Sequence, residues 1–189
     1  MSKTTQDLYK IWYKRLREEL PEQVDEKRRG ILQWLLNGEI SSDEQLEYRY
    51  RILRQRYLTV DSRQGYRLLI TRLACLMISL SSVRTWMEHS GLSDQDLLRL
   101  LQKVIQKLVD QDPHWQKQVK QMAKLTQDGH LRQAFVLASL ELYSLHSVNG
   151  QPWLFYLLRQ SFRHQLETPI VQHNREYASS ELIKLTTSL

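Results

Sequence analysis

Apolar side chains recur along this chain with the spacing of an α-helix, and this periodicity limits the fold more than any other feature. Leu46, Tyr50, Leu53 and Tyr57, for example, follow one another at intervals of three and four residues, which places them on one side of a helix. The chain holds 6 Gly and 4 Pro among 189 residues, few for a fold built from many turns. No alternating strand pattern accompanies the helical spacing. The sequence therefore predicts an all-α fold.

Short polar segments divide the periodic stretches into about eight or nine helices. We expect the first two helices over residues 6–20 and 22–36, and a later one from residue 113 to about 126. Small polar residues just before a periodic stretch predict helix N-caps, because their side chains accept hydrogen bonds from the first free N–H groups. The N-caps predicted in this way are Ser41 or Ser42, Asp61 or Ser62, Ser93, and Asp112 followed by Pro113.

The pattern predicts one compact all-helical domain over residues 1–168, in which residues 1–45 pack on residues 46–168. The composition turns polar after that point, so we expect residues 169–189 to form a tail with a short C-terminal helix. Cys75 is the only cysteine and lies in an apolar stretch, so we expect it to be buried. A single cysteine fits the reducing cytoplasm, and neither a secretory signal nor a long apolar run indicates a membrane.

Residues 49–72 concentrate the positive charge. The chain has 27 Lys and Arg against 21 Asp and Glu, a net charge of +6. This segment alone holds seven arginines and one acid, Asp61, and seven minus one also gives +6. A focused positive field suits a polyanion, so the segment predicts contact with double-stranded DNA. The candidate contacts are Arg49, Arg51, Arg54, Arg56, Arg63, Arg67 and Arg72.

Two expected helices joined by a short bend within this segment resemble a helix-turn-helix. Arg63 and Arg67 would then begin the second helix, where a recognition helix meets base edges. A structural alternative stays open, because arginines beside an apolar stripe often pair with acids of neighbouring helices. A third possibility is an acidic protein partner. The acids available for internal pairing are Glu18, Glu19, Glu22, Asp25 and Glu26.

The sequence lacks the residue patterns of an enzyme. It has no phosphate-binding glycine loop, no nucleophile motif and no paired histidines on one helix face, so we expect no catalysis, metal, cofactor or small-molecule substrate. Glu141 is an acid within an otherwise apolar helix. Because a buried acid needs a hydrogen-bond partner, we expect it to bond to a buried group such as an arginine.

The segment QPWLFYLLRQSFRHQL, residues 151–166, is apolar around more of its circumference than one buried face requires. Such a helix is typical either of a protein interface or of a core position that is covered on several sides. Both interpretations stay open at this stage. The interface residues that it predicts are Trp153, Phe155, Tyr156 and Arg159.

Six sequence blocks, together covering about residues 46–168, carry a family resemblance: QRYL (55–58), YRLLITRL (66–73), RTWM (84–87), LQKVIQKL (101–108), LRQAFVLASLELY (131–143) and QPWLFYLLR (151–159). Their order and spacing resemble the HetZ-type regulators of heterocyst differentiation in cyanobacteria, and more distantly the PatU proteins. The resemblance implies a DNA-binding transcription regulator that acts with other regulatory proteins. Apart from the resemblance, we expect the protein to act as a homodimer or in a complex. The family's DNA contact is attributed to a helix-turn-helix, which implies roles for Arg54, Arg56, Arg67 and Arg72.

The chain departs from that family in length. HetZ-type proteins continue into a further C-terminal region with helix-turn-helix-like patterns, which nothing here matches. A second interpretation therefore stands beside DNA binding. In it the protein is a non-enzymatic interaction module that binds or sequesters another regulator and makes no direct contact with DNA.

Overall fold

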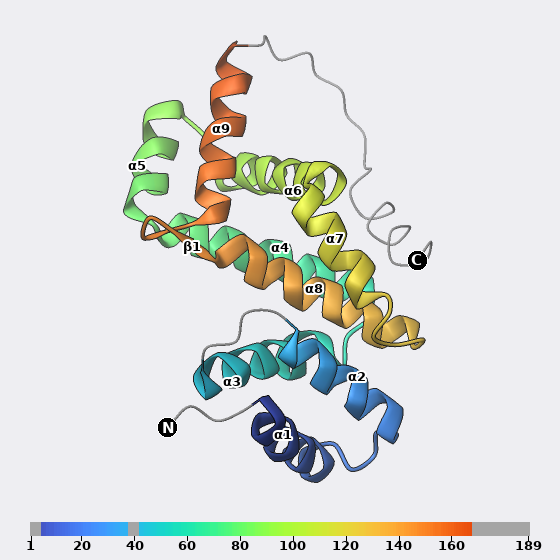
Figure 1. Ribbon diagram of the computed structural model, residues 1–189. Helices are drawn as coiled ribbons and strands as arrows, with labels where there is room; N and C mark the ends of the chain where they lie inside the picture. The colour runs from blue at the N-terminus through green and yellow to red at the C-terminus, as the bar shows by residue number, and fades with distance from the viewer. Residues whose placement is uncertain (1–4, 38–41, 168–189) are drawn as a thin grey trace.

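A computed structural model describes residues 5–37 and 42–167 of the chain, with side chains from residue 6 to residue 162 (Figure 1). The described residues form nine α-helices, a π-helical segment and one short hairpin, which confirms the all-α prediction. The elements are α1 (Thr5–Glu19), α2 (Asp25–Leu36), α3 (Asp43–Ile52), η1 (Leu53–Tyr57), α4 (Ser62–Ser79), α5 (Ser81–Ser90), α6 (Asp94–Gln111), α7 (Pro113–Met122), α8 (Gly129–Leu145), β1 (Ser147–Val148), β2 (Gln151–Pro152) and α9 (Trp153–Glu167).

Local capping chemistry fixes most of the helix starts. Ser42, Asp61 and Asp112 cap α3, α4 and α7, and each accepts a hydrogen bond from a backbone N–H of the first turn. Ser93 and Asp96 form a reciprocal capping box at the start of α6. The predicted N-caps are thereby confirmed, because a side chain two or three residues from a free N–H needs no tertiary contact to reach it.

Helix α8 lies at the centre of the arrangement. It contacts α3, η1, α4, α7 and α9. Figure 1 shows α4 and α8 crossing the middle of the molecule, with α1, α2 and α3 below them and α5, α6 and α9 above. One cluster of buried apolar side chains runs through these layers from Trp12 to Leu158.

Some boundaries differ from those expected. Helix α2 begins at Asp25 rather than residue 22, because residues 21–24 form a turn. Arg28 binds the start of this turn: its Nη1 donates to the backbone oxygens of Leu20 (2.8 Å) and Pro21 (3.3 Å). Helix α7 ends at Met122 rather than near residue 126. The β1–β2 hairpin was not predicted, since two-residue strands are too short to show alternation. The expected C-terminal helix lies outside the described residues.

Cys75 is exposed, so the prediction that it is buried was wrong. Helix α4 buries Tyr66, Leu69 and Leu73 against its neighbours, and its other side stays open. Leu68 and Leu76 lie on that open side with exposed fractions of 47% and 36%. When a helix has apolar residues on both sides, its sequence does not indicate which side is buried.

Among the described residues, no single helix is long and apolar enough to cross a membrane. Helices α4 and α5 meet the length and composition criteria only as a pair, and the chain bends by 89° between them. The bend follows from the backbone at Leu80, which leaves the helical region with φ −75° and ψ 122°.

Candidate nucleic-acid interface

The arginine segment folds into α3, η1, a turn over residues 58–61, and α4. Leu46, Tyr50, Leu53 and Tyr57 are all buried, with at most 1% of each side chain exposed, which confirms the predicted apolar stripe. The final turn of this helix widens to π geometry over Leu53–Tyr57. A helix-turn-helix in the DNA-binding sense remains a prediction.

Two of the seven arginines pair with the buried carboxylate of Glu141. The Glu141 side chain has no exposed surface, and its Oε1 pairs with Arg56 and, at 2.9 Å, with Nε of Arg72. The hydroxyl of Tyr57 donates to Oε2 at 2.6 Å. Burial, and then the Glu141 charge, raise the pKa of Tyr57, so its hydroxyl keeps the proton that it donates. The expected arginine partner of Glu141 is confirmed.

A third arginine, Arg54, pairs with Glu19 of α1. The same carboxylate is bound by Arg15 and accepts a hydrogen bond from the Tyr50 hydroxyl at 3.2 Å. Burial alone would raise the pKa of Glu19, but the hydrogen bond and charge of Arg15, with smaller contributions from Tyr50 and Arg54, bring it below its ordinary value. Glu19 belongs to the acidic group that the structural alternative named.

Arg49 is half-buried, and its guanidinium is bound by carbonyl groups. Its Nη1 donates to the oxygen of Asn37 at 2.9 Å and its Nη2 to that of Trp34 at 2.7 Å, at the end of α2. The guanidinium carbon lies 4.9 Å from the centre of the Trp34 ring. Burial lowers the pKa of Arg49 to about 10. Arg49 therefore closes the C-terminus of α2.

Arg51, Arg63 and Arg67 remain exposed. None of the three side chains forms an ion pair or hydrogen bond with the described residues, although Arg51 lies 5.7 Å from the ring centre of Tyr48. Four of the seven predicted contact residues thus have internal partners, and three are free to meet another molecule. The segment therefore contains both internally paired arginines, as the structural alternative predicted, and exposed arginines on the protein surface.

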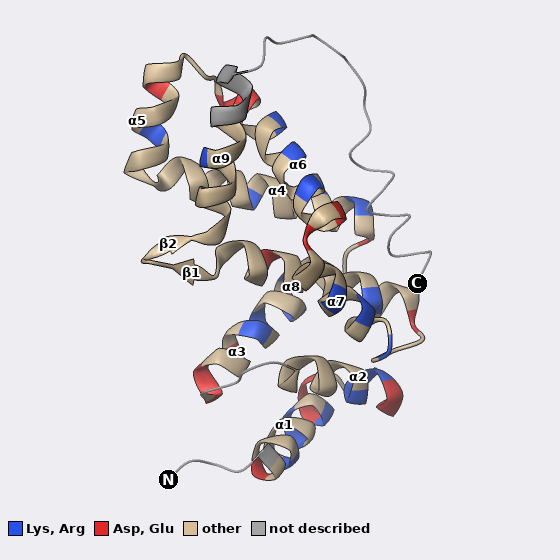
Figure 2. Ribbon diagram, turned by 45° about the horizontal axis from the view of Figure 1, so that its top comes forward, with Lys and Arg blue, Asp and Glu red and all other residues tan. Residues whose placement is uncertain are grey.

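The exposed residues of α4 form one surface, here called the α4 outer face. Helix α4 contains no Asp or Glu, so no acid of its own offsets the arginines on this face (Figure 2). Gln64 and Thr71 were not singled out from the sequence, although their helical spacing from Arg67 places them on the same side. The α4 outer face consists of Arg63, Gln64, Arg67, Leu68, Thr71, Arg72, Cys75, Leu76 and Ser79.

The predicted partner interface on α9 is placed as follows. Trp153, Phe155 and Tyr156 are half-buried, and Arg159 is exposed. The Tyr156 hydroxyl donates to the backbone oxygen of Val148 at 3.2 Å, which ties α9 to the hairpin. The partner interface on α9 stays a prediction.

Over residues 5–37 and 42–167, no group of three or more His, Cys, Asp or Glu side chains is arranged to hold a metal ion. Comparisons with protein-family models, with curated proteins and with solved structures found no match for this chain. The resemblance to HetZ-type regulators therefore depends on the sequence blocks alone.

Proposed function

We propose that this protein is a DNA-binding transcription regulator, of the kind that the HetZ resemblance implies, and that it contacts duplex DNA through the N-terminal half of the α4 outer face. The observation that carries the proposal is an exposed helix face with two arginines one turn apart and no acid from its own helix. Arg63 and Arg67 are the principal contacts. Arg51 adds a third exposed charge from α3.

The residue types on this face suit a duplex. Arginine donates two hydrogen bonds to guanine or binds phosphate, and glutamine reads adenine, so Arg67 and Gln64 can recognise base edges. The start of α4 itself is a poorer phosphate site, because Asp61 already accepts the N–H groups of Arg63 (2.9 Å) and Gln64 (3.0 Å). Binding must therefore come from side chains rather than from the helix N-terminus.

The proposal is tested by fluorescence anisotropy with a mixed-sequence duplex at about 50 and about 200 mM salt. Arg63→Ala/Arg67→Ala should abolish most of the binding. The matched control is Arg29→Ala/Arg84→Ala, which removes the same charge from exposed arginines of α2 and α5. Equal losses in both variants would point to net charge alone, and no binding by the wild type would refute the proposal.

A second candidate function has its own observation. Leu68, Cys75 and Leu76 expose apolar surface on the α4 outer face, and apolar groups beside arginine are typical of protein interfaces. The protein would then bind a second copy or another regulator without contacting DNA. Sedimentation across a range of protein concentrations, with Leu68→Ser/Leu76→Ser as the comparison, distinguishes self-association through this face from a monomer.

A further inference from the structure

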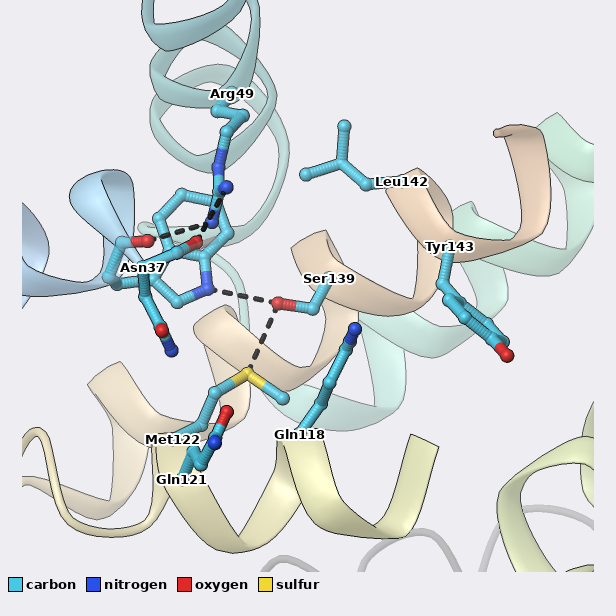
Figure 3. A pocket seen from close by; sticks show the side chains of 9 residues that line it. Asn37, Arg49, Gln118, Gln121, Met122, Ser139, Leu142 and Tyr143 are labelled. Atoms are coloured by element: carbon cyan, nitrogen blue, oxygen red, sulfur yellow. Dashed lines mark hydrogen bonds between the residues drawn. The ribbon is translucent and has the colours of Figure 1, made fainter. Parts of the chain in front are cut away.

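A cavity of about 260 Å³ opens where α2 ends, between α3, α7 and α8 (Figure 3). Arg49 enters it from one side, and Gln118, Gln121 and Met122 of α7 line the opposite side. Nothing in the DNA-binding proposal uses this cavity. Its volume approaches the lower end of the range found for small-molecule sites, about 300 Å³.

Arg49 differs from the other internally paired arginines because no described carboxylate pairs with it. Arg54, Arg56 and Arg72 each contact a glutamate, whereas Arg49 has two backbone carbonyls, and its Nε is buried without a hydrogen-bond partner. Arg49 is half-buried, and a cation that is partly removed from water without a counter-charge is costly. The lowered pKa of Arg49 reflects that same burial.

The end of α2 offsets this charge only in part. The carbonyl groups at a helix C-terminus act as roughly half a negative charge, so about half of the Arg49 charge has no counterpart there. An anion in the cavity would supply the remainder. The guanidinium retains further N–H groups for it, because each Nη nitrogen carries two hydrogens and has one carbonyl partner in the structure.

The rest of the cavity wall is mixed in character. Ser139 accepts from Trp34 Nε1 at 2.9 Å and donates to Met122 Sδ at 3.1 Å, so these three side chains are fixed (Figure 3). Met122 and Leu142 provide apolar surface. The exposed Gln121 amide has no hydrogen-bond partner among the described residues.

We propose that this cavity binds a small molecule in which a carboxylate adjoins an apolar group. The carboxylate meets the Arg49 guanidinium, and the apolar group lies along Met122 and Leu142. Gln121 is placed to hydrogen-bond to a polar substituent. Such a molecule is a bound ligand and undergoes no reaction at this site.

Benzoate and its neutral counterpart benzamide are suitable probes, followed by NMR of the ¹⁵N-labelled protein. The Trp34 indole N–H should shift with benzoate and stay unchanged with benzamide. Arg49→Gln should weaken benzoate binding about tenfold, the expected effect of losing a charged hydrogen bond. Arg29→Ala should leave the binding unchanged, because Arg29 is an exposed arginine of α2 that does not line the cavity. Circular dichroism checks that each variant is folded.

The comparison of the two probes on the wild type needs no variant. Equal shifts with benzamide, or none with benzoate, would overturn the proposal, as would full retention of binding in a folded Arg49→Gln. Glu39 lies outside the described residues, so Glu39→Gln is measured in parallel. Benzoate binding that occurs only in that variant would also overturn the proposal, because the chain's own carboxylate would then be the anion.

Discussion

Glu141 is the shared ion-pair partner of two arginines in the segment. It is fully buried in α8, and its charge is balanced by Arg56 of η1 and Arg72 of α4. Two arginines and one glutamate leave one positive charge. The Glu141 carboxylate is removed from water, so its charge is stable only with these partners in place.

Glu141→Gln should therefore lower the free energy of unfolding by about 3 kcal/mol, because Arg56 and Arg72 would lose their shared counter-ion. Chemical denaturation measures the change. The control is Glu88→Gln, at an exposed acid of α5, which should stay within about 0.5 kcal/mol of the wild type. Equal stability of the two variants would contradict the role given to Glu141.

Glu19 should make stability depend on pH. Its pKa in the folded protein lies below the ordinary value of 4.5, so its contribution is complete above that value and declines as the pH falls through the folded-state pKa. Glu19→Gln should cost about 1 kcal/mol near neutral pH and progressively less in acid. Urea denaturation across this pH range measures the difference between the two proteins. A difference that does not change with pH would contradict the assignment.

From the sequence we could predict what kind of contact a residue makes, but not always which residue is its partner. A lone acid in the apolar helix around Glu141 indicated an arginine partner, because buried charge must be balanced. The sequence did not indicate which arginine, since Arg56 lies 85 residues away and Arg72 lies 69 residues away. Arg49 was missed as a capping residue because its partners are backbone carbonyls, which leave no mark in a sequence.

Individual helices were more predictable than the contacts between them. The starts of α3, α4, α6 and α7 follow from caps within three residues, so they were visible locally. The π-helical turn of η1 was not, because its side chains follow ordinary helical spacing. Which side of α4 faces α8 is likewise decided by the packing of the whole fold.

Helices α4 and α8 approach each other closely at Gly65. A Cβ at this position would lie 2.7 Å from Cδ1 of Leu137 and 3.4 Å from Cγ2 of Val60. Gly65→Val should therefore lower the free energy of unfolding by about 2 kcal/mol through overpacking. Gly129→Val is the comparison, because a Cβ there has nothing within 4 Å. Similar unfolding curves for the two variants would refute the close approach.

At the scale of the whole molecule, folding determines how many arginines of the segment remain unpaired. The sequence shows seven arginines with one acid, whereas the structure pairs three of them with Glu19 and Glu141 and holds Arg49 against the end of α2. The all-α class was predictable because periodicity is local. The number of free cations was not, because it depends on helices far apart in the sequence.

This division predicts a modest salt dependence of DNA binding. If only Arg51, Arg63 and Arg67 neutralise phosphates, the slope of log K against log salt should be about −3, whereas seven contacts would give about −6. A salt titration of the wild type measures the slope. A slope near about −6 would show that the internally bound arginines leave their glutamate and carbonyl partners when DNA binds.

The claim that matters most is that the arginine segment has two roles carried by different residues. Arg67→Ala and Arg56→Ala test it most directly, with duplex affinity and free energy of unfolding measured on both proteins. Arg67→Ala should lose about 1–3 kcal/mol of binding free energy without a change in stability. Arg56→Ala should lose about 3 kcal/mol of stability, while its folded fraction binds DNA like the wild type. An equal loss of affinity in both variants, with unchanged stability, would contradict the account.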